Sequence, residues 1–333
     1  MPFPRALPSR LGHVAISLAI ALALVLFAAW PSAVAGKTVE GANAGVTTDD
    51  NGGSGGSGAG GTGGSASPPI VAPTPSIGPI TGTASAAPSP TATPAPDTPG
   101  YDVSYPQCGK QLPEASAFQI VGVNRGKVFT VNKCLAAGDH GSQLEWAGRD
   151  AQFYMNTGNP GPDLSSHWPD GQTSPRPCNT RDQPGTDTDA CAYDYGWNAA
   201  AHAYSVAVKA YISLGWAPKD ATRTPVANAW WLDVETSNTW RDWDRNIAVL
   251  HGAVDYLESV GAESVGFYST ELQWFWITGY AQEFADYPSW HAGAVTRDEA
   301  LADCANTAFT GGRLTLTQYF EGDLDANVRC PAS

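Results

Sequence analysis

The composition of the chain changes abruptly near residue 100, and this change decides where a folded core can form. Residues 36–99 contain no aromatic residue and no cysteine, and they consist largely of Gly, Ser, Pro, Thr and Ala. Such a segment cannot bury enough apolar surface to offset its ordering entropy, so we predict a disordered linker. Residues 100–333 hold all six cysteines, all 12 tyrosines and all but one of the 12 tryptophans. We therefore predict that this range folds as a single domain.

Residues 1–35 have the pattern of a secretory signal peptide. Arg5 and Arg10 precede an uncharged, mainly apolar run from Val14 to Trp30, and the small residues of 33–35 (AVA) offer a cleavage site. The run is short for a bilayer core of roughly 30 Å, and an uncleaved membrane anchor is the alternative. We expect export, with the domain secreted or associated with the cell surface or cell wall.

The formal net charge of the chain is −14, and lysines and arginines form no cluster. Nucleic acids and anionic membrane surfaces are therefore poor candidate partners. The sequence indicates no cofactor and no protein partner, and we expect a monomer. The six histidines are scattered, and neither a CxxC pair nor an HExxH motif occurs, so we predict no zinc site.

Six cysteines in an exported chain predict three disulfides, because the compartment is oxidising. Fifteen pairings are possible for six cysteines. We favour Cys178–Cys191, which closes a short loop, and give less weight to Cys108–Cys134 and Cys304–Cys330.

Short apolar runs alternate with helical patterns along residues 100–333. Strands are predicted over residues 101–105, 118–123, 151–156, 229–235, 264–269, 288–292 and 314–319. Helices are predicted over 198–214 and around 247–257, where a plausible cap follows at Gly261. The repeated order of strand, helix and strand predicts a parallel α/β sheet, and the length favours a single TIM-like (β/α) barrel.

Residues 157–192 interrupt this alternation, because they are rich in Pro, Gly and Asp. Loops of this length are lids, binding loops or disordered segments, and a Cys178–Cys191 bridge argues for order. Asp187 and Asp189 are two residues of a type that binds calcium, but the remaining positions of a calcium loop are absent. We favour solvated turn residues.

The run WWLDVE at residues 230–235 places two acids on one face of a strand. Side chains alternate along a strand, so Trp231, Asp233 and Glu235 point to the face opposite the one with Trp230 and Leu232. In a barrel, the face with Trp231, Asp233 and Glu235 would be the interior. Catalytic groups of such barrels lie at the carboxyl ends of the strands. The alternative is that the acids are solvated loop residues or helix caps.

Other predicted strand ends carry matching polar groups. Asp102 lies in YDVSYPQ, Gln318 ends LTLTQ, and Asp325 follows in GDLDANV. Clustered acids raise one another's pKa, which keeps a carboxylic acid protonated near neutral pH. Glycoside hydrolysis requires such a donor beside a second, ionised carboxylate.

The pieces YDVSYPQ, WWLDVE, GFYS, PSWHAG and TQY…GDLDAN, in this order, resemble glycoside hydrolase family 25. That family contains muramidases of the bacterial cell wall, built on a modified β/α barrel. The resemblance spans most of residues 100–330. It departs from the family at Cys108, at the second strand (VGVNRG), in residues 157–192 and in the cysteines, as expected of an outlying branch of exported bacterial proteins.

The resemblance implies a role for several individual residues. Glu235 matches the general acid, Asp233 its partner in the D-x-E motif, Asp102 the aspartate of the first strand and Asp325 the late aspartate. Residues that line the cleft are matched by Tyr268, Trp290 and Gln318. We add Trp231, on the inward face of its strand, as a substrate-binding residue.

These observations favour a secreted glycosidase that cuts peptidoglycan, or a related cell-wall glycan, between N-acetylated sugars. Glu235 would protonate the leaving oxygen, while the developing positive charge would be stabilised by Asp233 or by the substrate's own acetamido group. A non-catalytic glycan-binding module on the same barrel is the alternative.

Limited proteolysis tests the predicted domain boundary. Residues 36–99 should be cleaved readily while 100–333 resists, since only the second range can form a core. Mass spectrometry of the fragments locates the cuts, and equal sensitivity of both ranges would contradict the boundary.

Overall fold

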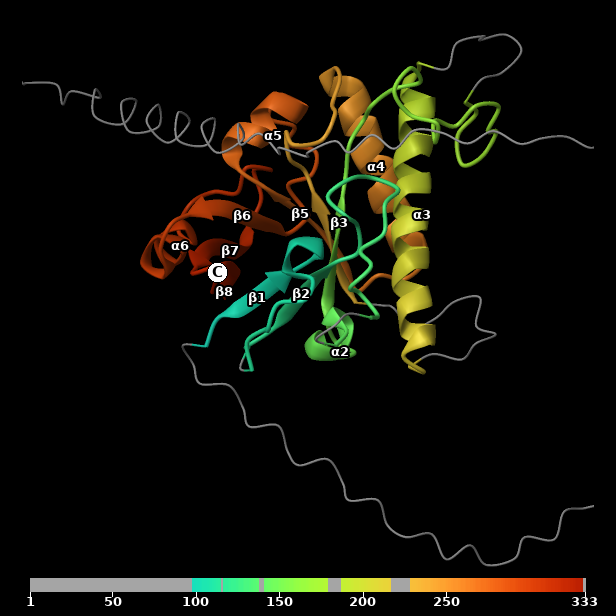
Figure 1. Ribbon diagram of the computed structural model, residues 1–333. Coiled ribbons are helices and arrows are strands. Elements are labelled where there is room, and N and C mark those ends of the chain that lie inside the picture. Colours follow the sequence, from blue (N-terminus) through green and yellow to red (C-terminus); the bar gives the residue numbers. More distant parts are fainter. Residues whose placement is uncertain (1–97, 115, 138–140, 179–186, 217–227, 332–333) are drawn as a thin grey trace, which may run out of the picture. The chain divides into compact units, whose positions relative to one another are not determined.

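A computed structural model describes residues 98–331 except 115, 138–140, 179–186 and 217–227 (Figure 1). The predicted signal segment, and all but residues 98 and 99 of the predicted linker, lie outside the described residues. Within the part described, no helix combines the length and apolarity needed to cross a membrane.

Eight strands close into a barrel in chain order, which confirms the predicted TIM-like architecture. The strands are β1 (Gly100–Val103), β2 (Gln119–Gly122), β3 (Gln152–Asn156), β4 (Ala229–Asp233), β5 (Ser264–Ser269), β6 (Ser289–Ala294), β7 (Leu314–Glu321) and β8 (Leu324–Arg329). Successive strands from β1 to β7 pair in parallel, whereas β8 is antiparallel to both β7 and β1.

The expectation of a wholly parallel sheet is therefore wrong at β8, which the sequence analysis did not predict as a strand. Only Gly322 and Asp323 separate β7 from β8, and Gly322 has a φ of +64°. Two residues suffice for a hairpin but not for a parallel crossover, which takes a dozen or more. The Gly-Asp pair between two strand-like runs is the local signal that indicates this hairpin.

The helical elements are η1 (Tyr105–Gln107), α2 (Gln143–Ala147), α3 (Asp189–Ser213), α4 (Trp243–Ser259), α5 (Glu271–Thr278) and α6 (Arg297–Asp303). α3 begins nine residues before the predicted start at 198, because Thr188 caps it by accepting a hydrogen bond from the Cys191 N–H. α4 ends as predicted, and Gly261 follows its cap with a φ of +88°.

Two glycines let α3 and α4 lie side by side on the barrel (Figure 1). A Cβ at Gly196 would lie 1.9 Å from the main-chain oxygen of Val249, and one at Gly252 would lie 1.9 Å from that of Tyr193. The two backbones meet closely at these points, and any larger residue would separate the helices.

The alternation predicted for β4 divides the apolar residues between two cores. Trp230 and Leu232 are buried in the layer between the strands and the helices. Trp231 is buried inside the barrel, together with Trp290 and Leu316. The face of β4 that bears Asp233 is therefore the inner one.

The structure joins all six cysteines: it contains the favoured pair Cys178–Cys191 and the two pairs given less weight, Cys108–Cys134 and Cys304–Cys330. Cys178–Cys191 ties the long segment before α3 to the first turn of that helix. Asp187 is paired with Arg241 and Arg245 and Asp189 lies in the first turn of α3, so the prediction that both are solvated turn residues is wrong.

Replacing both Cys178 and Cys191 by serine should lower the free energy of unfolding by about 3 kcal/mol, because the bridge closes a loop with a sequence separation of 13. Chemical denaturation of the oxidised proteins measures the loss. The matched control removes Cys304–Cys330, whose separation of 26 predicts a loss roughly 0.6 kcal/mol larger. Unchanged stability in the first variant would mean that the segment before α3 is held without its bridge.

Candidate active site

A cavity of about 340 Å³ opens at the carboxyl ends of the barrel strands. Seven of the eight predicted catalytic or substrate-binding residues line it: Asp102, Asp233, Glu235, Tyr268, Trp290, Gln318 and Asp325. The eighth, Trp231, does not line the cavity. Its side chain is only 3% exposed inside the barrel, and its Nε1 donates to Oε1 of Gln152 at 2.7 Å.

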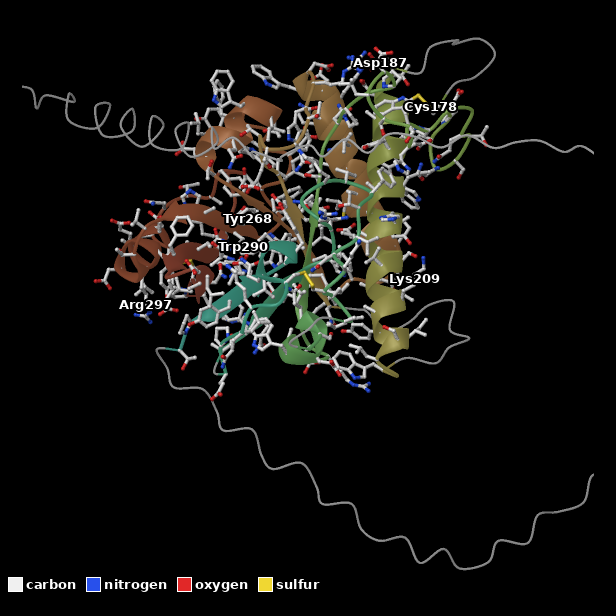
Figure 2. All side chains as sticks on the ribbon, viewed as in Figure 1. Cys178, Asp187, Lys209, Tyr268, Trp290 and Arg297 are labelled. Atoms are coloured by element: carbon white, nitrogen blue, oxygen red, sulfur yellow. A yellow bond between two sulfur atoms is a disulfide. The ribbon has the colours of Figure 1, made fainter. Side chains whose placement is uncertain are left out.

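Two aromatic side chains form one wall of the cavity. Tyr268 of β5 and Trp290 of β6 are register partners on neighbouring strands, and Figure 2 labels both. Their ring centroids are 4.5 Å apart in an edge-to-face arrangement. This contact fixes the two rings relative to each other and to the barrel, so the wall is rigid.

Asp102 is held by two side-chain amides. Its Oδ1 accepts hydrogen bonds from Nε2 of Gln318 at 3.0 Å and from Nδ2 of Asn327 at 2.7 Å. The two aromatic residues orient these amides, since the Tyr268 hydroxyl donates to Oε1 of Gln318 and Nε1 of Trp290 donates to Oδ1 of Asn327, each at 2.8 Å. The sequence analysis did not single out Asn327, although its spacing of two from Asp325 places both on one face of β8.

Burial of Asp102 raises the pKa of its carboxyl to about 8, and the charge of Asp325 adds to the rise. The hydrogen bonds from Asn327 and Gln318 act in the opposite direction. Asp325 faces Asp102 across the β1–β8 ladder, and burial also raises its pKa, followed by the charge of Glu235. Lys110 partly offsets this second rise. Because Asp102 and Asp325 would carry like charges on neighbouring strands, their proximity favours retention of a proton by one of them.

Asp233 and Glu235 form a second carboxyl pair, and each affects the pKa of the other. Burial, and then the charge of Glu235, raises the pKa of Asp233 well above its usual range, while burial raises that of Glu235. Two carboxyls that interact so closely titrate as a unit. Asp233 is 4% exposed, whereas Glu235 is half-buried and is the member more open to the cavity.

Two further side chains position this pair, and the sequence analysis missed both. Nδ2 of Asn156, at the end of β3, donates to Oδ2 of Asp233. Gln273 of α5 is hydrogen-bonded to the Glu235 carboxyl and accepts from the N–H of Thr236. Asn156 ends a predicted strand and could have been noticed for that reason. Gln273 lies on a helix, and no local pattern marks it.

The cavity therefore gathers four carboxyl groups with raised pKa values beside an aromatic wall. Such a set can hold a proton near neutral pH and keep a neighbouring carboxylate ionised, which are the two requirements of acid-assisted cleavage of a glycosidic bond. Among the described residues, no group of three or more His, Cys, Asp or Glu is arranged to hold a metal ion.

Comparison with known proteins adds a sequence relationship. No protein-family model matches the chain. A segment of 62 residues is 37% identical to probable GH family 25 lysozyme 4 of Dictyostelium discoideum. The resemblance to family 25 is confirmed over this segment. The match covers 19% of this chain and 29% of the lysozyme, less than a third of that relative's length.

Solved structures of similar proteins align over a larger part of the chain. The lysozyme of Streptomyces coelicolor aligns with 71% of this chain and 93% of its own, at 17% identity and a TM-score of 0.40. The autolysin LytC of Streptococcus pneumoniae, solved with a synthetic peptidoglycan ligand, aligns with 69% of this chain and 46% of its own, at 11% identity and a TM-score of 0.43. Because both scores are low, the fold rests on the strand order described above.

The raised pKa of Asp102 predicts a loss of stability with rising pH. Between about pH 4 and pH 8 the folded protein keeps a proton on Asp102 that the unfolded chain releases, so the free energy of unfolding falls over this range. Asp102→Asn cannot ionise and keeps an oxygen acceptor for Asn327 and Gln318. Urea denaturation at pH 4.5 and pH 8 should show a smaller decline in this variant than in the wild type.

Asp286→Asn is the matched control, because Asp286 is exposed and lies outside the cavity. It should reproduce the wild-type decline. If Asp102→Asn declines as steeply as this control, Asp102 is ionised in the folded protein and the assignment of its proton is wrong.

Proposed function

We propose that residues 100–333 form a glycoside hydrolase that cleaves peptidoglycan, or a related N-acetylated cell-wall glycan. The observation that carries this proposal is the Asp233–Glu235 carboxyl pair in a cavity that it shares with Asp102 and Asp325. The sequence match to a probable family 25 lysozyme supports the substrate class.

In this proposal Glu235 delivers the proton to the leaving glycosidic oxygen. Burial raises the pKa of Glu235, and Glu235 is the member of the pair more open to the cavity, so it can hold a proton and release it there. Loss of that proton leaves Asp233 ionised, and its carboxylate then stabilises the positive charge that develops at the sugar carbon. Asn156, which donates to Asp233, holds that carboxylate in place.

Asp102 and Asp325 influence the pKa values of the Asp233–Glu235 pair. Asp325 and Glu235 interact electrostatically, and Asp102 is coupled to Asp325, so their charges keep the pKa values in the cavity high. The half-buried Tyr268 ring can contact a sugar ring, while the buried Trp290 supports it from behind; their hydrogen bonds to Gln318 and Asn327 also hold Asp102.

We further propose that the protein acts outside the cytoplasm, as an exported domain attached to a linker. Its three disulfides support an oxidising compartment. The segment expected to direct export, residues 1–35, lies outside the described residues.

Glu235→Gln should lower the rate of glycan hydrolysis by at least the roughly 10²–10⁴-fold that general acid catalysis contributes. The amide is nearly isosteric, so the fold should be retained. New reducing ends released from purified peptidoglycan give the rate, and circular dichroism checks the fold. Asp233→Asn should be severely impaired as well, because it removes the stabilising charge.

Glu263→Gln is the matched control, since Glu263 is exposed and immediately precedes β5, at the end of the barrel opposite the cavity. It should retain wild-type activity. Hydrolysis that survives Glu235→Gln undiminished would remove Glu235 from the mechanism. A wild-type protein that binds peptidoglycan without cleaving it would be a binding module on the same barrel.

A further inference from the structure

Five large apolar side chains of α4 and α5 form an aromatic surface that the proposed reaction does not use. Its members are Trp243 of α4, Leu272, Phe275 and Trp276 of α5, and Tyr280 just after that helix. Phe275 is half-buried, whereas the exposed fractions of Trp243, Leu272, Trp276 and Tyr280 are 51%, 53%, 63% and 42%. An exposed apolar patch with polar residues at its edge marks an interaction site.

Contacts between α4 and α5 fix the rings of the aromatic surface. The Phe275 ring centroid lies 5.4 Å from that of Trp276 and 4.8 Å from that of Tyr280. Trp243 lies on another side of Phe275, at 6.4 Å, and its Nε1 donates to the Trp276 carbonyl at 3.3 Å. A Cβ at Gly279 would come within 2.7 Å of the Trp243 indole, so this indole packs closely on the chain after α5. Rings held in this way lose little side-chain entropy when a ligand binds.

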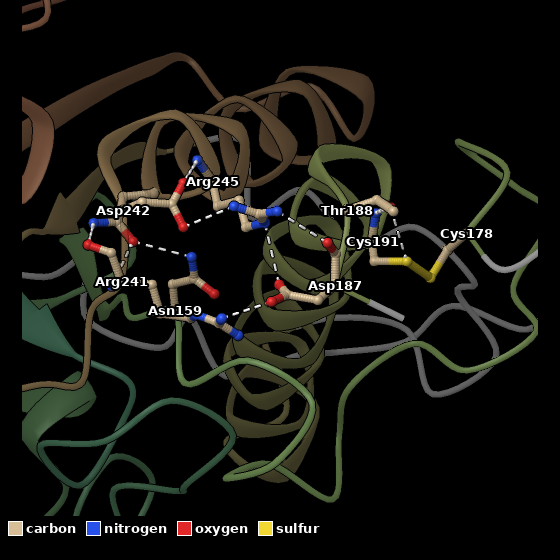
Figure 3. Close-up of polar contacts among 9 residues, drawn as sticks. Asn159, Cys178, Asp187, Thr188, Cys191, Arg241, Asp242 and Arg245 are labelled. Carbon is tan, nitrogen blue, oxygen red and sulfur yellow. Dashed lines mark hydrogen bonds and ion pairs between the residues drawn. A yellow bond between two sulfur atoms is a disulfide. The ribbon is translucent and has the colours of Figure 1, made fainter. Parts of the chain in front are cut away.

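An open hollow of about 340 Å³ continues the aromatic surface at Trp243. It is lined by Arg241, Asp242, Trp243 and Asp244. Ion pairs hold two of its walls, since Arg241 pairs with Asp187 at 2.6 Å and Arg245 pairs with Asp242 at 2.9 Å (Figure 3). Asp244 takes part in no ion pair among the described residues. The hollow therefore presents an indole ring beside both hydrogen-bond donors and acceptors.

This combination of groups fits an uncharged polysaccharide. The face of a sugar ring carries C–H groups that pack on an aromatic ring, and the hydroxyls at its edge donate to carboxylates and accept from guanidinium groups.

The charges at the edge of the aromatic surface argue against other classes of ligand. Asp244 directly follows Trp243, and Glu271 directly precedes Leu272; both acids are exposed. They would repel an acidic polymer or an anionic membrane. A hydrocarbon layer that covered the rings would remove water from these carboxylates, which is costly.

The aromatic surface is separate from the acidic cavity. None of its five residues lines that cavity. Trp274 and Ile277 of α5 are buried in the core against the barrel, whereas Leu272 and Trp276 lie on the exposed face of the same helix. A ligand on the aromatic surface thus binds outside α5 and needs no carboxyl group of the cavity.

We infer that the aromatic surface is a second binding site, which holds an uncharged polysaccharide without cleaving it. Sugar rings pack on Trp243 and Trp276, and their hydroxyls bond to Asp244 and Arg241 in the hollow. This inference goes beyond the proposed function, because it involves none of the residues assigned to the reaction. Such a site keeps the domain on an insoluble glycan, whether or not the cavity is occupied.

Retention of the full-length Glu235→Gln protein on insoluble chitin, an uncharged polymer, tests the inference without cleavage. Depletion from solution gives the Kd. Trp276→Ala in this background should raise the Kd about tenfold, because one stacked ring is lost. Trp276→Tyr should keep most of the affinity, since it retains an aromatic face.

Leu272→Ala and Leu301→Ala form a matched pair. Both leucines are exposed, but Leu301 belongs to α6 and lies outside the aromatic surface. Leu272→Ala should weaken retention on chitin, and Leu301→Ala should leave it unchanged. Tyr268→Ala, which alters the acidic cavity, should also leave it unchanged. Circular dichroism checks the fold of each variant.

The inference is overturned if the parent is not retained on chitin, or if Trp276→Ala is retained equally well. Retention that depends on Tyr268 would place chitin in the acidic cavity and also overturn it. Self-association that Trp276→Ala abolishes in analytical ultracentrifugation would assign the surface to a second copy instead. Hydrolysis of peptidoglycan by the wild type is measured separately. Retention without hydrolysis would overturn the proposed function alone, and hydrolysis without retention would overturn the inference alone.

Discussion

β8 runs antiparallel between β7 and β1, and its register brings Asp325 opposite Asp102 and Asn327 opposite Gln318. Asp102 is buried and Asp325 is half-buried, and two neighbouring carboxyls in such a site do not both ionise without cost. The barrel offsets that cost with amide donors from Gln318 and Asn327 and by keeping a proton on Asp102. The remaining features of the acidic cavity depend on this closure, because the same amides are oriented by Tyr268 and Trp290.

The Asp233–Glu235 pair repeats the same physical solution on the opposite wall of the barrel. Asn156 supplies the amide donor, and burial raises the pKa of both carboxyls. Uncharged side-chain amides thus donate hydrogen bonds to the carboxyls of Asp102 and Asp233. Lys110 is the cation that lowers the pKa of Asp325. Lys127 lies at the rim of the acidic cavity, where its Nζ donates to the Ser237 carbonyl, and it also lines a neighbouring cavity beside the long segment before α3. The acidic cavity is lined by four carboxyl groups and the neighbouring cavity by none, although Lys127 lines both.

Patterns within a single strand or helix correctly predicted features that depend on neighbouring residues in the sequence. The inward face of β4 followed from strict alternation, and the end of α4 followed from Gly261. The early start of α3 was missed because Gly196 and the Asp and Pro residues before it weaken a helical pattern. That glycine is required by the close contact with Val249 of α4, a reason that only the packed helices reveal.

The sequence by itself determined which side chains could reach the end of the barrel, since alternation and strand ends select Asp102, Asp233, Glu235 and Gln318 from a single chain. It did not determine their partners. Gln273 reaches Glu235 from a helix 38 residues further along, and Asn327 reaches Asp102 across 225 residues. Trp231 has the correct parity but lies too deep to line the cavity. Depth along the barrel, register across β8 and the cavity beside residues 158–167 are set by contacts between distant segments, and a periodic pattern within one strand does not encode them.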